Sequence, residues 1–94
     1  MSGLDPLAPV RAAAVRMIRA GHDLHHSASE DPDLALLDGD RLYAEGLAAL
    51  AADGDLEAVR VMAEIIAVSA TALGHGDRAA AERAWEQGLR DLAS

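Results

Sequence analysis

Apolar and polar residues recur at helical spacing along four stretches of the chain, and short segments rich in Gly, Pro and Asp separate these stretches. The spacing predicts helices over about 10–27, 32–52, 56–73 and 78–93. The β-branched residues cluster in one stretch and do not alternate with polar residues, as they would in a half-buried strand. The pattern therefore predicts an all-α protein, a small helical bundle of about four helices that forms a single domain over residues 1–94.

Each predicted helix after the first follows an aspartate that suits an N-cap. Asp31 stands before Pro32, which suits the first helical position, and Asp55 and Asp77 each follow a glycine. An N-cap oxygen accepts hydrogen bonds from the free N–H groups of the first turn, so these aspartates mark where three helices begin. The last helix has one apolar face, made by Ala81, Trp85, Gly88, Leu89 and Leu92.

The second predicted helix carries two apolar stripes. One stripe is Leu37, Ala44, Leu47, Ala48 and Ala51, and the other is Ala35, Gly39, Leu42, Gly46 and Ala49. The second stripe consists mostly of small residues, which permit close approach of another backbone. Two apolar stripes predict two packing partners for this helix.

The third predicted helix has more apolar surface than a chain of this length can cover. Glu57, Arg60 and Glu64 form one polar strip, and from Ile65 to Leu73 every face is apolar or small. A helix that is apolar all round is normally buried, and this chain offers few neighbours to bury it. We therefore predict that the central helices form a dimer interface. Its expected residues are Leu42, Gly46, Met62, Ile65, Ile66, Val68 and Leu73.

The composition favours close helix packing and self-association. Hydrophobic residues make up 51% of the 94-residue chain, but Trp85 and Tyr43 are the only aromatic ones, so Ala, Leu, Val and Ile must fill the core. Small side chains fill space only where helices approach closely. A chain of this length is also near the size at which one core is only marginally sufficient.

The charge and the absence of cysteine exclude several classes of function. A net charge of −8 and a pI near 4.7 argue against nucleic acid or an anionic membrane as a partner, because phosphate contacts need clustered Lys and Arg. Without cysteine there are no disulfides or thiolate metal sites. The first ten residues lack the features of a signal peptide, and the longest apolar run is too short for a membrane span. We therefore expect a cytoplasmic protein.

Three segments between about residues 14 and 76 carry a family resemblance. They are Met17–Ser27, Leu36–Leu47 and Asp53–Ala67, and the second contains the pair Gly39-Asp40. In this order they resemble the central helices of trans-isoprenyl diphosphate synthases (polyprenyl synthetases), the all-α enzymes that join isopentenyl diphosphate to an allylic diphosphate. The resemblance implies that two central helices supply much of a dimer interface.

The sequence departs from this family at the motifs that carry out catalysis. The family needs two aspartate-rich motifs, whose carboxylates hold Mg²⁺ against the departing diphosphate. In one alignment with the family's first motif, His26 and Ser27 stand where the family has two aspartates. In a second alignment, shifted to match His22-Asp23, only one of these aspartates is present. A second aspartate-rich motif and the downstream Arg pair are missing. The resemblance therefore implies a non-catalytic small subunit or remnant, which associates with itself or with a full-length synthase. Mg²⁺ and prenyl transfer are expected only when a catalytic partner supplies them.

The end of the first predicted helix offers an alternative function. His22 and His26 lie four residues apart, a spacing that can chelate a divalent metal, with Asp23 or Glu30 as a third ligand. The alternative hypothesis is thus a small homodimeric bundle that binds a metal at His22, His26 and Asp23. The competing interpretation is that these histidines bind no metal and are polar residues at a helix end, where positive charge suits the helix dipole. Asp40 is expected to be a buried hydrogen-bonding residue at a helix contact.

Overall fold

The computed structural model describes residues 8–27 and 30–93 and, within them, contains four α-helices and no strand. The helices are α1 (Pro9–His25), α2 (Pro32–Ala52), α3 (Leu56–Gly74) and α4 (Arg78–Ala93). They confirm the predicted all-α bundle. The predicted bounds are close, except that α1 ends at His25 rather than near residue 27. Residues 1–7, part of the segment considered for a signal peptide, lie outside the described residues.

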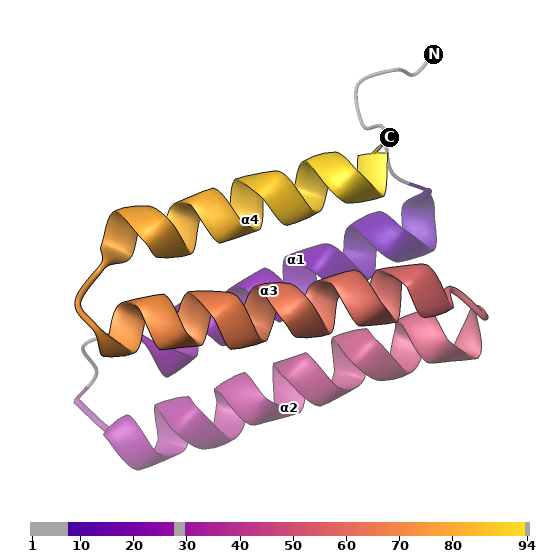
Figure 1. Ribbon diagram of the computed structural model, residues 1–94. Helices are drawn as coiled ribbons and strands as arrows, with labels where there is room; N and C mark the ends of the chain where they lie inside the picture. The colour runs from indigo at the N-terminus through magenta and orange to yellow at the C-terminus, as the bar shows by residue number, and fades with distance from the viewer. Residues whose placement is uncertain (1–7, 28–29, 94) are drawn as a thin grey trace.

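The helices run up and down, so that each is antiparallel to the next (Figure 1). α1 packs on α2, α3 packs on α4, and the two hairpins meet where α3 contacts α1 and α2. α2 and α4 therefore lie on opposite sides of the bundle, with α1 and α3 between them. In the described part of the chain, no helix has the length and apolar character needed to cross a bilayer.

The helix starts confirm the three predicted N-caps. The carboxylates of Asp31, Asp55 and Asp77 each accept a hydrogen bond from the backbone N–H three residues further on, at 3.1, 3.2 and 2.9 Å. Gly54 and Gly76 precede two of these caps with φ of 74° and 75°. This left-handed conformation is strained for residues with a Cβ, which explains why glycine occupies both turns.

The core lies where the two hairpins meet and has one large aromatic side chain. Trp85, Ile18, Leu50 and Met62 are its largest fully buried apolar side chains. Trp85 is 1% exposed, which confirms its predicted role as a core anchor. Smaller residues complete the cluster, namely Ala14, Val15, Ala58, Val61, Ile65 and Leu92.

α1 and α2 approach each other through glycines. A Cβ added to Gly21 would lie 2.7 Å from the Gly39 carbonyl oxygen, and one on Gly39 would lie 2.9 Å from the Gly21 carbonyl oxygen. About two turns further along α2, a Cβ on Gly46 would lie 2.5 Å from Ile18 Cγ1 and 3.0 Å from the Ala14 carbonyl oxygen. Backbone thus meets backbone through the small-residue stripe of α2, as predicted, and the structure identifies α1 as the helix that this stripe faces.

An ionic cluster joins both hairpins at the other end of α1. Arg11 donates to both carboxylate oxygens of Asp55 at 2.6 Å and to the Leu92 carbonyl oxygen at 2.9 Å. The two charged side chains are 19% and 16% exposed. The carboxylate holds the pKa of Arg11 above its usual value, and the guanidinium holds the pKa of Asp55 below its usual value. One arginine of α1 thereby fixes the start of α3 and the end of α4.

The close contact of α1 and α2 yields the first testable prediction. Gly21→Ala should lower the free energy of unfolding by roughly 1–3 kcal/mol, because the added methyl group overlaps a backbone oxygen that cannot rotate away. Gly74→Ala is the matched control, since nothing lies within 4 Å of its Cβ position. It should be neutral or stabilise by up to about 1 kcal/mol through helix propensity. Urea unfolding of both variants measures the difference, and equal stabilities would contradict the glycine contact.

Candidate functional site

The exposed face of α3 carries no charged side chain from residue 65 to residue 74. On this face Ala67, Ala70, Thr71 and Gly74 are exposed, and Val68 is 50% exposed. A half-exposed valine within an uncharged helical surface is an apolar patch available to another molecule. The structure therefore leaves part of the apolar surface of α3 exposed to solvent.

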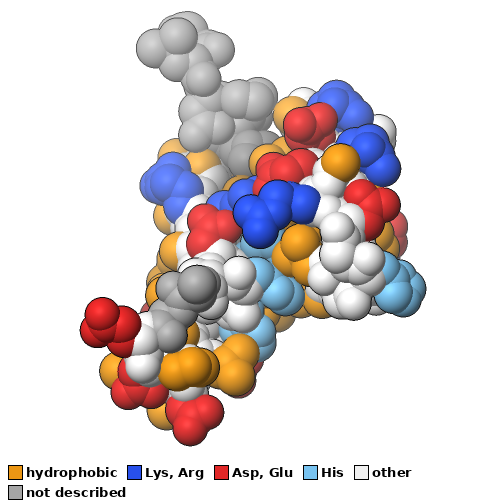
Figure 2. Space-filling model, turned by 90° about the vertical axis from the view of Figure 1, so that its left-hand side faces the viewer, with side chains coloured by type: hydrophobic (Ala, Val, Ile, Leu, Met, Phe, Trp, Pro, Cys, Tyr) orange, Lys and Arg blue, Asp and Glu red, His pale blue; other side chains and the backbone are white. Residues whose placement is uncertain are grey.

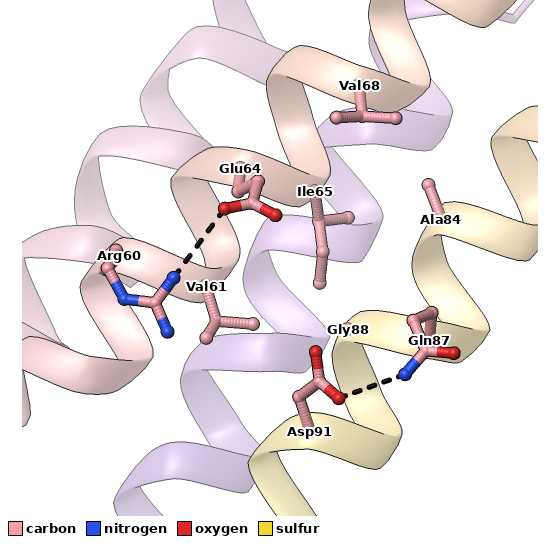
Figure 3. A pocket seen from close by; sticks show the side chains of 9 residues that line it. All are labelled: Arg60, Val61, Glu64, Ile65, Val68, Ala84, Gln87, Gly88 and Asp91. Carbon is pink, nitrogen blue, oxygen red and sulfur yellow. Dashed lines mark hydrogen bonds and ion pairs between the residues drawn. The ribbon is translucent and has the colours of Figure 1, made fainter.

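A groove runs between α3 and α4 beside this surface. Figure 3 shows its first part, with Val61, Ile65 and Val68 on the α3 side and Ala84 and Gly88 on the α4 side. The volume of this part is about 190 Å³. Gly88 and Ala84 make a low α4 wall, and a Cβ on Gly88 would collide with Ile65. These apolar residues share the lining of this part with Arg60, Glu64, Gln87 and Asp91.

Charged and polar groups mark the two ends of the groove. At the end drawn in Figure 3, Arg60 lies 3.6 Å from Glu64, and Gln87 donates to Asp91 at 3.0 Å. At the other end, beyond Val68, the lining includes Ala67, Thr71, Ala72, His75, Asp77 and Ala80. The groove thus consists of two adjoining hollows that share Val68, and polar or charged groups line both of them.

The seven residues predicted for an interface divide into three groups. Gly46, Met62 and Ile65 are buried within the chain, and Ile65 also lines the groove between α3 and α4. Leu42, Ile66 and Leu73 are half-buried. Val68 is the one of the seven that is exposed. Ile65 is covered because Gly88 lets α4 approach α3 closely.

Sequence reasoning did not assign the α4 side of the groove to a binding surface. Ala84 and Gln87 were not singled out, and Gly88 was assigned to the inward face of the last helix, where the structure buries it. The spacing of Ala80, Ala84 and Gly88 by four residues was the available signal, because it gives one helix face with almost no side-chain volume. On α2, Leu37, 67% exposed, begins a second uncovered stripe.

The histidine cluster lies at the end of α1, beside the start of α4. Figure 2 looks onto this end, where histidine side chains gather beside arginine and acidic ones. His22 is buried, with its ring centroid 4.7 Å from that of His26 and 5.1 Å from that of Trp85. Arg19 lies over the Trp85 ring, 5.0 Å from its centroid. His22 is therefore a core residue, whereas His26 is exposed as expected for a residue at a helix end.

Both imidazoles favour the neutral form. Burial lowers the pKa of His22, and the neighbouring charges of His26 and Arg19 lower it further. Burial and then His25 lower the pKa of His26. Arg19 pairs with Asp23 at 3.1 Å and with Glu82 at 2.8 Å, which lowers the pKa of Glu82.

The predicted metal ligands are only partly brought together. His22 and His26 are neighbours, but Asp23 pairs with Arg19, and within residues 8–27 and 30–93 no three His, Asp or Glu side chains meet in a group that could hold a metal ion. The two imidazoles remain a possible ligand pair. The same geometry does not fit the Mg²⁺ site of the synthases, which needs several carboxylates. Asp40 accepts a hydrogen bond from His25 Nε2 at 2.5 Å, as expected of a helix contact, but its side chain is exposed rather than buried.

Comparisons with known proteins add no assignment. No family model matches the sequence, and no match was found among the curated proteins or among the solved structures.

The environment of His22 predicts how stability depends on pH. Because the folded pKa lies below the ordinary 6.5, the unfolded chain takes up the proton first as the pH falls. The stability contributed by neutral His22 is complete above that value and is lost as the pH falls toward the lowered pKa. His22→Gln should therefore flatten the decline in stability just below pH 6.5.

Urea unfolding followed by the fluorescence of Trp85, the single tryptophan, measures this slope. His75→Gln, at the exposed C-cap of α3, is the control and should retain the wild-type slope. An undiminished slope in the His22 variant would show that another group causes the decline.

Proposed function

We propose that this protein is a non-catalytic helical subunit that acts by binding another helix at the groove between α3 and α4. The observation that carries the proposal is the exposed, uncharged surface around Val68. The partner is either a second copy of the chain or a catalytic subunit of the isoprenyl diphosphate synthase type. The resemblance of residues 14–76 to that family supports the second choice of partner.

The exposed apolar side chains support an associating role. Val68 lines the groove and is 50% exposed, whereas the exposed Leu37 and Leu56 lie outside it. Fully burying a Val side chain is worth about 1.5–3 kcal/mol, so a partner that covers Val68 gains part of this free energy. In a chain of this size, that gain is a sizeable fraction of the total stability.

The carboxylates of the chain support a non-catalytic role. Prenyl transfer of the synthase type requires clustered carboxylates to hold Mg²⁺ against a diphosphate. Near the end of α1, Asp23 is paired with Arg19 and Asp40 with His25. The described residues assemble no cluster that could take over this task.

A charge placed in the groove should abolish association. Val68→Asp puts a carboxylate at the centre of the uncharged surface, where a docked helix would have to desolvate it. Light scattering coupled to size exclusion should show association for the wild type, alone or mixed with a full-length isoprenyl diphosphate synthase from the same organism. The variant should remain folded and monomeric in both cases.

Val10→Asp is the matched control, because it makes the same substitution at a 41% exposed valine in the first turn of α1. This variant should associate like the wild type. Loss of association in both variants would indicate a general effect of charge. Unchanged association in the Val68 variant would refute the groove as the binding surface.

The purified chain should show no prenyl transfer with Mg²⁺, isopentenyl diphosphate and an allylic diphosphate. The physical reason is that His26 and Ser27 stand where the resemblance expects carboxylates. A radiolabelled transfer assay with extensively purified protein provides the measurement. Turnover that stays with the protein through successive purification steps would overturn the non-catalytic assignment.

A further inference from the structure

We infer that His22 and His26 of α1 bind one divalent transition-metal ion between their imidazole rings. Imidazole nitrogen suits Zn²⁺, Ni²⁺ and Cu²⁺, which defines the class of ion. Within the part of the chain that the structure describes, no third His, Asp or Glu completes a group with these two, so water takes the other positions around the ion. The site shares no lining residue with the groove between α3 and α4, and the inference is independent of the proposed function.

The end of α1 places the two imidazoles side by side. The backbone N–H of His26 donates to the His22 carbonyl oxygen at 3.2 Å, so the helical bonding continues to His26 and sets both side chains on one face. Their ring centroids are 4.7 Å apart. Because a bond from Zn²⁺ to a histidine nitrogen is about 2.0–2.1 Å long, two rings on one ion have centroids roughly 5 Å apart. The two rings therefore already lie near the separation that a shared ion requires.

Both imidazoles line one hollow of about 250 Å³ between the end of α1 and the start of α4. His22 is 4% exposed, and its Nδ1 atom is buried without a hydrogen-bond partner. Such atoms are rare in native proteins, and a bound water or ion is a common explanation for them. The indole N–H of Trp85 is also buried and unpaired, but it is a donor only and cannot bind a cation.

The charges that line the hollow are balanced. Arg19 and Arg78 are matched there by Asp23 and Glu82. Both carboxylates already hold Arg19, at 3.1 Å from Asp23 and 2.8 Å from Glu82, so this guanidinium is not free to bind an anion. The net charge of −8 on the chain favours a cation over an anion.

The protonation state of the two rings also suits a metal ion. Burial lowers the pKa of both His22 and His26, so the neutral form predominates near pH 7. A metal ion needs the neutral form, because the nitrogen lone pair makes the bond.

His25 lies next to the site but belongs to another contact. Its Nε2 atom pairs with Asp40 of α2 at 2.5 Å, and its ring centroid is 6.0 Å from that of His26. His25 therefore provides a matched control, being a neighbouring histidine that is engaged elsewhere.

Titration of the tag-free chain with Ni²⁺, followed by the fluorescence of Trp85, tests the site. The Trp85 ring centroid lies 5.1 Å from that of His22, so a paramagnetic ion bound to this imidazole should quench the emission. We expect saturable quenching, and a higher Tm at saturating Ni²⁺ or Zn²⁺, because an ion that binds only the folded chain stabilises it. A wild type that shows neither effect overturns the site.

Variants identify the ligands. His26→Gln removes one imidazole at an exposed position, leaves the buried His22 in place, and should weaken Ni²⁺ binding by at least about tenfold. His25→Gln should bind Ni²⁺ like the wild type. Equal affinity of all three proteins would show that the ion binds elsewhere, and loss of binding in the His25 variant would overturn His22 as the second ligand.

Discussion

The contact of α1 with α2 is the constraint on which the rest of the bundle depends. Gly21 and Gly39 bring two backbones so close that a methyl group on either would meet a carbonyl oxygen. With its small-residue stripe used in this contact, α2 turns its other stripe away from α1, and Leu37 of that stripe remains exposed. Leu47 of the same stripe packs against the core, so only part of this stripe is exposed.

The second hairpin, α3 with α4, is also closely packed through a glycine. Gly88 of α4 accepts Ile65 of α3, so the two helices lie close, and the shallow wall that remains on α4 borders the groove. Where a large side chain does occur, as with Trp85, it lies between the hairpins and gathers His22 and Arg19 around it. The core therefore consists of close helix contacts around a single large ring.

Local features were predictable from the sequence because they depend on neighbouring residues. The caps at Asp31, Asp55 and Asp77 and the turns at Gly54 and Gly76 need only residues within one turn of each other. Helical spacing also placed Trp85 in the core. A periodicity of 3.6 residues in the apolar positions shows which face of a helix is apolar. It does not fix which other helix covers that face.

The features that sequence reasoning missed are set by long-range packing. His22 was predicted as a metal ligand or, in the competing interpretation, as a polar residue at a helix end, but the approach of α4 buries it against Trp85. Met62 and Ile65 were predicted for an interface, and the structure adds that both are already packed inside the single chain. The Arg11–Asp55 pair joins residues far apart in sequence, and no local pattern indicates it.

The Arg11 cluster also bears on when the fold can be completed during protein synthesis. The hairpin contacts within α1–α2 and α3–α4 involve segments that leave the ribosome one after the other, so each hairpin can begin to form early. The bond from Arg11 to the Leu92 carbonyl spans 81 positions and needs almost the entire described chain. Until translation reaches that point, Asp55 can cap α3 and pair with Arg11, but the last turn of α4 is not there to be held. The Arg11 cluster is therefore complete only after the last turn of α4 has been synthesised.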